Sequence, residues 1–329
     1  MYTRLRDAKQ EERIEASAET IAIAGAGSIG TAWSMVFAIA GHRVALHDHD
    51  ASRETAAFAF IRQRLTEMAR TMGLSEDIAA ITGRVGFHPH LAAAVAGASF
   101  VIECIVEDIG AKRKLVSALE TLVASDTIIA SSSSFIPASE WSRGSGLASR
   151  CLVLHPGNPP YLIRVVEVVP SPDTACAVVE RAQRLMQAVG MVPIHLRKEI
   201  EGFVFNRLQG ALLREAYALV RDGVTTADEI DCLVRDGLGL RWSVAGPFET
   251  VDLNTRGGIA AHAQRMLPAY RRMAEERGET ALAWTPEAIA TVVAERRNAL
   301  PLEQWDARVH WRDRELMRLL AHRAQRKPI

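Results

Sequence analysis

Gly25-Ala26-Gly27-Ser28-Ile29-Gly30 is a glycine-rich segment from which the fold of this chain can be predicted. The apolar run Ile21–Ala24 leads into it, and the helix-compatible run Thr31–Ala40 follows. In such a strand–turn–helix unit the first glycine permits a tight turn, the second lets the backbone approach a pyrophosphate, and the third allows close packing of helix on strand. A pyrophosphate would lie on the free N–H groups at the positive end of the helix. We therefore predict that a dinucleotide is held at Gly25, Gly27, Ser28, Ile29 and Gly30. A glycine-rich turn without a ligand is the alternative.

Asp48 identifies the dinucleotide. It follows Gly25 by 23 residues, directly after the apolar run Arg43–His47. An acid at the end of the second strand hydrogen-bonds the adenosine ribose hydroxyls and repels a 2′-phosphate. The sequence therefore predicts NAD rather than NADP. Arg53 is the one nearby basic residue that weighs against this choice, and we expect it at the surface.

Short apolar runs alternate with helical stretches between Thr20 and His195. Strands are predicted at Ile21–Ala24, Arg43–His47, Phe100–Glu103, Thr127–Ala130, Cys151–Leu154, Val165–Val169 and Val192–His195, and helices at Thr31–Ala40, Glu54–Thr71 and Lys112–Ala124. This alternation indicates a parallel sheet with helices on both faces. The segment after Cys151–Leu154 is too short for a helical crossover, so we expect the strand that follows it to run antiparallel.

Strand patterns end after Glu199. Helices are predicted at Gly202–Arg221, Thr226–Arg235, Gly257–Arg277, Pro286–Ala299 and Leu302–Arg323. Thr226 begins a capped helix, because acids follow it in the first turn. We therefore expect an α/β fold in three parts: an N-terminal extension (1–19), a Rossmann-type NAD-binding domain (20–199) and an all-α C-terminal domain (200–329).

Bulk composition narrows the class of protein. The 39 basic and 39 acidic residues cancel, so charge gives no reason to expect a nucleic-acid or membrane-surface partner. The uncharged stretch Ile21–Gly41 is broken by glycines, and we expect no membrane segment. The four cysteines are far apart and form no CxxC pair, which favours reduced, mostly buried thiols in a cytoplasmic protein.

Three further motifs carry a family resemblance. With His155-Pro156-Gly157-Asn158-Pro159-Pro160-Tyr161, Val165–Val169 and Gly202–Leu208, the chain resembles the 3-hydroxyacyl-CoA dehydrogenase superfamily. Within it the chain is most similar to the lambda-crystallin group, whose enzyme activity is L-gulonate 3-dehydrogenase. The distinguishing pieces are the double proline of HPGNPP, Asp236–Arg241, Gly246–Thr250 and the helix around Trp311-Arg312-Asp313. The resemblance covers Ile21 to the C-terminus. It implies a C-terminal domain of the 6-phosphogluconate dehydrogenase C-terminal-like type and a homodimer formed through that domain.

His155 and Glu167 suit an alcohol oxidation. A base must take the hydroxyl proton while hydride leaves for the nicotinamide. His155 ends a strand, at the sheet edge where ligands of open α/β folds bind. Glu167 lies in the returning strand, where its carboxylate can orient the imidazole and stabilise the imidazolium. The alternatives are a buried structural histidine and a surface glutamate on a strand. The two residues together favour a catalytic pair.

The resemblance implies four more site residues. Ser134, at the end of the run Ser131–Ser134, and Asn206 would hydrogen-bond the substrate hydroxyl or the developing carbonyl oxygen. Glu107 and Lys112 match the family's cofactor contacts on the nicotinamide side. The alternatives are a flexible serine loop, a helix-surface asparagine, a helix-start acid and a solvated helix lysine. Where the superfamily has a small polar residue, this chain has Phe135.

Arg241 points to the substrate. The GxGFY-type motif with which acyl-CoA dehydrogenases of the superfamily commonly end is absent, and the chain carries Arg241 in the segment DGLGLR. An arginine facing a dry pocket needs an anion, and the carboxylate of a small hydroxy acid fits its planar fork. We expect L-gulonate as substrate. A 3-hydroxyacyl-CoA, carnitine, a surface role for Arg241 and a non-enzymatic crystallin-like role remain alternatives.

Two histidine pairs raise the question of a metal. Alternation in a strand would place His47 with His49, and His88 with His90, on one face. No cysteine or acid cluster joins them, so we expect no metal site.

Overall fold

The computed structural model describes residues 18–74, 76–243, 246–247, 250, 258–277, 301–304, 307, 310, 314, 317–318 and 321–322. The chain divides into two compact units, Met1–Arg207 with Val309–Ile329, and Leu208–Arg308. Several sequence predictions lie outside the described residues: most of the N-terminal extension, the helix Pro286–Ala299, the tripeptide Trp311-Arg312-Asp313, and Phe248 and Glu249.

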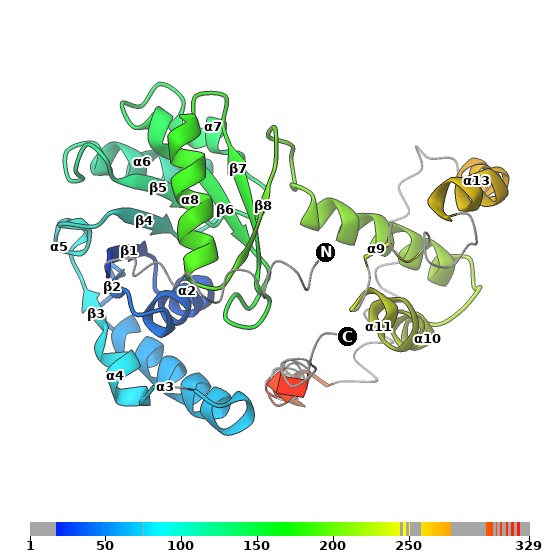
Figure 1. Cartoon of the computed structure of the whole chain (residues 1–329), viewed down its shortest axis with the longest axis horizontal. Coiled ribbons are helices and arrows are strands. Elements are labelled where there is room, and N and C mark those ends of the chain that lie inside the picture. The colour runs from blue at the N-terminus through cyan, green and yellow to red at the C-terminus, as the bar shows by residue number, and fades with distance from the viewer. Residues whose placement is uncertain are drawn as a thin grey trace. The chain divides into compact units, whose positions relative to one another are not determined.

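An eight-stranded sheet forms the centre of the first unit (Figure 1). Its order is β3-β2-β1-β4-β5-β6-β7-β8. The strands are β1 (Thr20–Ala24), β2 (Arg43–His47), β3 (Val85–His88), β4 (Phe100–Glu103), β5 (Ile128–Ser131), β6 (Cys151–Pro156), β7 (Val165–Pro170) and β8 (Val192–His195). All neighbours run parallel except β6 and β7. Seven strands were predicted, and the predicted antiparallel pair is confirmed. The edge strand β3 was missed, because glycine and histidine interrupt its apolar pattern.

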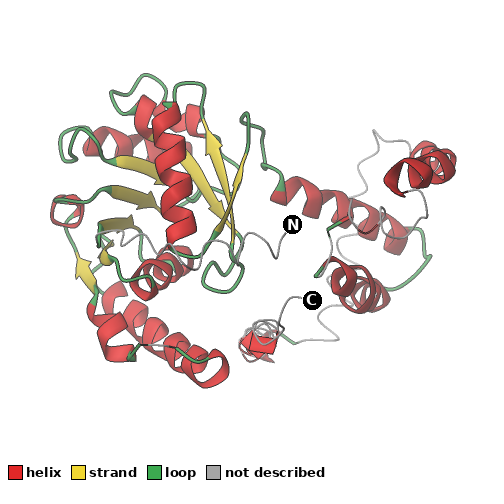
Figure 2. Ribbon diagram, in the orientation of Figure 1, coloured by secondary structure: helices red, strands yellow, loops and turns green. Residues whose placement is uncertain are grey.

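Helices cover both faces of this sheet (Figure 2). They are α2 (Ser28–Ile39), α3 (Arg53–Met72), α4 (Ile78–Gly83), α5 (Leu91–Val95), α6 (Ile109–Leu119), α7 (Ala138–Ser142), the 3-10 turn η1 (Ala148–Arg150) and α8 (Cys176–Ala188). Side chains of β1 alternate between two buried clusters, Ile21 and Ile23 in one and Ala22 in the other. This alternation explains why the strands are apolar throughout, since a parallel sheet is buried on both faces. Met317, far along the chain, also belongs to the core of this unit.

The described part of the second unit consists of helices and loops. Its elements are α9 (Phe205–Arg221, whose first turn belongs to the first unit), α10 (Ala227–Leu233), the π-helix η2 (Val234–Leu238), α11 (Gly239–Trp242), α13 (Gly258–Arg277) and the 3-10 turn η3 (Leu302–Gln304). The predicted cap at Thr226 is confirmed: its side chain accepts from the Glu229 N–H, and Glu229 accepts from the Thr226 N–H. Arg277 joins α13 to α9 through Glu215, at 3.0 Å, and also contacts Asp222.

The structure bears on membrane segments and on the cysteines. Within the described ranges, no helix is both long and apolar enough to cross a bilayer. All four cysteines are free thiols, but Cys176 and Cys232 are exposed. The prediction that the thiols are mostly buried is therefore wrong for those two, because Cys176 is the first residue of α8 and Cys232 lies in an exposed stretch of α10.

Candidate active site

The glycine turn after β1 is shaped by contacts that only glycine tolerates. Gly25 has φ +110°, and a Cβ there would lie 2.5 Å from the Cys104 carbonyl oxygen at the end of β4. A Cβ on Gly30 would lie 1.9 Å from the carbonyl oxygen of Gly25. At Gly27 no atom lies within 4 Å of the Cβ position, and α2 begins at Ser28 without a side-chain cap. The open backbone and the free helix N-terminus fit the pyrophosphate of NAD.

Asp48 is tied to this turn. One oxygen of its carboxylate accepts a hydrogen bond from the Ala26 N–H at 2.9 Å, and the other accepts from the Asp50 N–H at 3.1 Å. The side chain keeps 15% of its surface exposed. A carboxylate therefore stands at the end of β2 beside the glycine turn, as the NAD prediction requires. Arg53 is exposed and lies 3.8 Å from Asp50.

His155 and Glu167 form a buried pair. They face each other in the register of β6 and β7, and His155 Nδ1 lies 2.7 Å from Glu167 Oε2. Only 6% of His155 and 3% of Glu167 is exposed. The other carboxylate oxygen accepts from the N–H groups of Val204, at 2.8 Å, and Phe205, at 3.0 Å. The alternative of a surface glutamate is therefore wrong, and a buried charge of this kind is stabilised by the hydrogen bonds to both oxygens.

Phe203 is a site residue that the sequence analysis missed. Its backbone is left-handed at φ +50°, directly after Gly202 at φ +72°. This turn aims the first N–H groups of α9 at Glu167. The fully buried ring of Phe203 lies 5.5 Å from the His155 ring, and Phe205 meets the same imidazole edge-on at 6.1 Å. The motif Gly202-Phe203-Val204-Phe205 contributes to the family resemblance, but its residues alone do not predict a contact with β6.

Ser134 and Asn206 are in contact. The side-chain amide of Asn206, in the first turn of α9, donates to the Ser134 carbonyl oxygen at 2.8 Å. The Ser134 N–H donates to Glu107 at 3.0 Å, and the neighbouring Ser133 hydroxyl donates to the same carboxylate oxygen at 2.5 Å. Both residues are half-buried. The loop after β5 is therefore held from two sides, by Glu107 and by α9.

Lys112 is not a solvated helix lysine. Only 2% of its side chain is exposed, and its ammonium lies 2.7 Å from Glu103 Oε2 and 3.1 Å from Glu107 Oε2. Burial by itself raises the pKa of Glu107, but the hydrogen bond from Ser133 and the charge of Lys112 outweigh it and hold that pKa below its usual range. Glu103, which the sequence analysis did not single out, is the deeper of the two carboxylates, with 3% exposed.

A connected set of polar contacts therefore runs along one edge of the sheet. Lys112 contacts Glu107, Glu107 accepts from Ser134, and Ser134 accepts from Asn206. Phe205 precedes Asn206 in α9, and its N–H donates to Glu167. Glu167 is also the hydrogen-bond partner of His155. This edge is the carboxyl end of the parallel strands, where open α/β sheets bind their ligands.

Arg241 lies in α11 of the second unit and is exposed. The preceding element is the π-helix η2, after which the Gly239 N–H donates to the Val234 carbonyl oxygen. A Cβ on Gly239 would lie 2.7 Å from that oxygen, which explains the glycine in the DGLGLR segment. The role of Arg241 in substrate binding stays a prediction.

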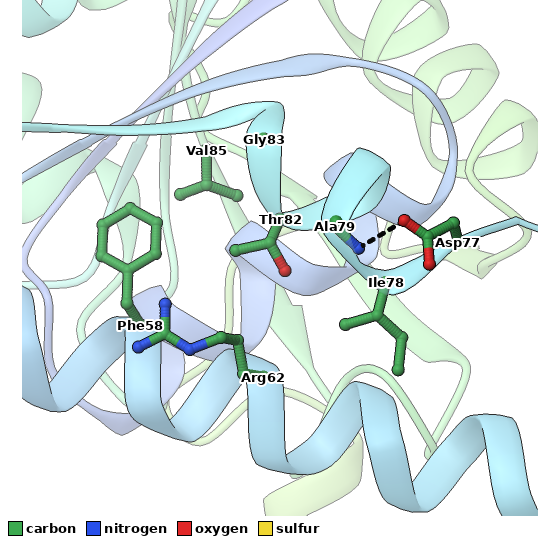
Figure 3. A pocket seen from close by; sticks show the side chains of 8 residues that line it. All are labelled: Phe58, Arg62, Asp77, Ile78, Ala79, Thr82, Gly83 and Val85. Atoms are coloured by element: carbon green, nitrogen blue, oxygen red, sulfur yellow. Dashed lines mark hydrogen bonds between the residues drawn. The ribbon is translucent and has the colours of Figure 1, made fainter.

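A cavity of about 650 Å³ lies elsewhere, between α3, α4 and the start of β3 (Figure 3). It is lined by Phe58, Arg62, Asp77, Ile78, Ala79, Thr82, Gly83 and Val85. None of these is a predicted site residue, and β3 begins there at its amino end, opposite to the edge that carries His155. Among the described residues, no group of three or more His, Cys, Asp or Glu side chains could hold a metal ion.

Comparison with known proteins gives a consistent result over both units. The pattern of the 3-hydroxyacyl-CoA dehydrogenase NAD binding domain matches residues 20–200, and that of the 3-hydroxyacyl-CoA dehydrogenase C-terminal domain matches residues 202–297. Lambda-crystallin of Oryctolagus cuniculus is 34% identical over 320 residues, which cover 95% of this chain and 98% of that protein.

Two other proteins are informative. The L-carnitine dehydrogenase/betainyl-CoA thioesterase of Ruegeria pomeroyi is 35% identical over 232 residues, which cover 70% of this chain and 47% of that protein. The crystal structure of a 5-formyl-3-hydroxy-2-methylpyridine 4-carboxylic acid 5-dehydrogenase, an NAD⁺-dependent dismutase, aligns with a TM-score of 0.78 and 26% identity. That alignment covers 94% of this chain and all of the other.

Proposed function

The chain belongs to the 3-hydroxyacyl-CoA dehydrogenase family, and from that premise we propose that it oxidises L-gulonate at its C3 hydroxyl to 3-dehydro-L-gulonate. Membership of this family gives the general activity: the chain is an NAD-dependent dehydrogenase that acts on 3-hydroxy substrates. The observation that carries the reaction is the buried His155–Glu167 pair at the carboxyl end of β6.

The proposed mechanism follows from the hydrogen bonds of that pair. Because Glu167 holds Nδ1 of His155, the Nδ1 atom carries the ring proton and Nε2 is the base that takes the hydroxyl proton. NAD bound at the glycine turn would supply the acceptor for the hydride that leaves the carbon bearing this hydroxyl. Glu167 then stabilises the imidazolium, and His155 releases the proton in the next step. We assign to Ser134 and Asn206 the hydrogen bonds to the substrate oxygen.

Residues of the glycine turn are proposed to hold the cofactor. Gly25, Gly27, Ser28, Ile29 and Gly30 would bind the pyrophosphate with backbone N–H groups, and Asp48 would bind the adenosine ribose. Glu107 and Lys112 are assigned to the nicotinamide side. The Glu107 carboxylate is 40% exposed, so it is the member of that pair that a bound group can reach directly.

A small carboxylate substrate has three supports. The chain resembles the lambda-crystallin group over nearly its whole length. The substrate of the structural neighbour is, by its name, a pyridine carboxylic acid. Arg241 supplies an exposed guanidinium, which binds a carboxylate through two parallel hydrogen bonds. The proposal assigns Arg241 to the carboxylate of L-gulonate.

L-Carnitine is the second candidate, because two half-exposed aromatic rings lie near the proposed base. Phe205 meets the His155 ring, and Phe135 lies 3.6 Å from the Cβ position of Gly202; their exposed fractions are 38% and 52%. Such rings attract a trimethylammonium group. The similarity to a carnitine dehydrogenase, which spans about half of that bifunctional protein, points the same way.

A substrate panel tests the proposal. The protein is incubated with NAD and with L-gulonate, L-carnitine, 3-hydroxybutyrate or 3-hydroxybutyryl-CoA, and NADH is followed by absorbance. We expect the highest kcat/KM with L-gulonate. A higher kcat/KM with L-carnitine or with the CoA thioester would refute L-gulonate as the substrate, but the proposed oxidation by NAD would stand.

Two variants test the assigned residues in the same assay. His155→Ala should lower kcat by about 10²- to 10⁴-fold, the contribution of a positioned general base. Arg241→Ala should raise KM for L-gulonate by roughly tenfold or more, the loss of a charge-assisted pair. Arg235→Ala is the matched control, because Arg235 is also exposed but is paired with Asp236 at 2.6 Å. An unchanged KM in Arg241→Ala would remove Arg241 from the site.

We also propose that the protein is a cytoplasmic homodimer and that residues 200–329 form the dimerisation domain. In the described part of the helical unit many large apolar side chains are exposed: Leu208, Leu212, Val224, Leu233, Leu240, Trp242, Tyr270 and Met273. Burial of such a surface favours association.

A further inference from the structure

Three charged residues, of which two are buried, form a cluster between the glycine turn and the proposed base. The cluster consists of Glu103, at the end of β4, Lys112, on α6, and Glu107, in the loop between them. Glu103 accepts hydrogen bonds from Lys112 at 2.7 Å, from the Ile105 N–H at 2.8 Å and from the Ser131 hydroxyl. Neither Glu103 nor the summed charge of the cluster has a part in the mechanism above.

The strand order places this cluster along the path of the cofactor. The glycine turn follows β1, and His155 lies at the carboxyl end of β6. Between those two strands the sheet contains only β4 and β5. A cofactor with its pyrophosphate on the glycine turn and its nicotinamide within hydride reach of the base must cross the carboxyl ends of β4 and β5. Glu103 and Ser131, which pair in the register of those strands, mark that crossing.

The cluster carries an excess of negative charge. Two carboxylates share one ammonium, so its formal sum is −1. Water cannot screen the attraction between Lys112 and Glu103, because only 2% and 3% of these residues are exposed. The pKa of Glu107 lies below its usual range, although burial alone would raise it, because the Ser133 hydroxyl and Lys112 stabilise the carboxylate. Charge in a partly buried site acts more strongly than at the surface.

We propose that this cluster discriminates between the two oxidation states of the cofactor and favours NAD⁺. The nicotinamide ring is positively charged in NAD⁺ and neutral in NADH, whereas the rest of the molecule is the same. A net negative site near the ring therefore stabilises the oxidised form selectively. Glu103 is the positioning residue of the cluster: it neutralises Lys112, so that the charge of Glu107 is left uncompensated.

The ratio of two dissociation constants tests this proposal without any substrate. Kd for NAD⁺ and Kd for NADH are measured by titration calorimetry for the wild type and for Glu103→Gln, which keeps the side-chain shape and removes one negative charge. We expect Kd(NAD⁺) to rise about tenfold relative to Kd(NADH), the size expected of one partly buried unit charge. Glu107→Gln makes the same change of charge at a more exposed position and should shift the ratio in the same direction.

Ser131→Ala is the matched control. It removes a hydrogen bond to Glu103 but no charge, so it should leave the ratio at its wild-type value even if both affinities fall. Equal changes of both Kd values in Glu103→Gln and Glu107→Gln, or a ratio that shifts as far in Ser131→Ala, would overturn the proposal. Failure to oxidise L-gulonate would refute the proposed substrate and leave this measurement unaffected.

Discussion

Individual residues of the first unit are constrained by contacts across the sheet more than by their neighbours in sequence. Gly25 must be glycine both because its φ is +110° and because the Cys104 carbonyl fills the space of a side chain. Glu167 is constrained in the same way, since its two oxygens bind His155 on β6 and the first turn of α9. A substitution at either position therefore disturbs more than one element.

Gly25→Ala should both destabilise the first unit and weaken NAD binding. An L residue at positive φ costs about 1 kcal/mol or more, and the collision with Cys104 adds to it. Gly41→Ala is the control, because Gly41 has φ +94° but no atom within 4 Å of its Cβ position. Urea unfolding and NAD titration measure the two effects. Equal losses in the two variants would mean that the contact with Cys104 is unimportant.

Acid should loosen the loop that carries Ser134. The pKa of Glu107 is lower in the folded chain than its ordinary value, because the Ser133 hydroxyl and Lys112 overcome the effect of burial. A carboxyl of this kind stabilises the fold above its unfolded pKa, about 4.3, and this contribution is lost as the pH falls through the folded value. The difference in unfolding free energy between wild type and Glu107→Gln should therefore shrink below about pH 4. A constant difference down to pH 3 would contradict this.

At the scale of elements, the turns before helices carry much of the specificity of the fold. The left-handed turn at Gly202 and Phe203 aims α9 at Glu167. The capping box at Thr226 begins α10, and the π-turn η2 requires Gly239. In each case the local sequence is compatible with the turn, but it does not predict the direction in which the following helix runs.

The start of α10 should resist acid but depend on Thr226. Hydrogen bonds from the Thr225 hydroxyl and from the backbone and hydroxyl of Thr226 lower the pKa of Glu229 to about 2. The cap therefore persists below the ordinary range of a glutamate and is lost only as the pH approaches 2. Thr226→Ala should weaken the helix start by about 1 kcal/mol. Hydrogen exchange of the α10 amides measures this, with Thr225→Ala, which keeps the cap itself, as the milder control.

Considering the whole molecule, the described part of the helical unit exposes large apolar side chains, among them Leu208, Leu233 and Leu240. Association through residues 200–329 predicts a particle of twice the chain mass in sedimentation equilibrium, at protein concentrations used for assay. NAD should not change that mass, because the cofactor residues belong to the first unit. A monomer at all concentrations would contradict the proposed dimer.

The β1–α2 glycine turn, every strand of the sheet except β3, and the antiparallel pair β6 and β7 were all predictable from the sequence. These features depend on local spacing: GxGxxG followed by a helix run, short apolar runs separated by helical stretches, and a connection too short for a crossover. The pairing of His155 with Glu167 was predictable for the same reason, since twelve residues and one reversal bring them into register.

Which polar residues contact one another could not be predicted from the sequence and is seen first in the fold. The pattern of α6 predicts a surface lysine at Lys112, yet its ammonium contacts both Glu103 and Glu107. The pairing of β4 with β5 places Glu103 and Ser131 side by side, within reach of that ammonium. Phe203 touches His155 across 48 residues of sequence, and β3 becomes a strand only through its pairing with β2. Periodicity reports which face of an element is apolar. It does not report which distant charge will meet that face, because that depends on the order and register of strands that are not neighbours in the chain.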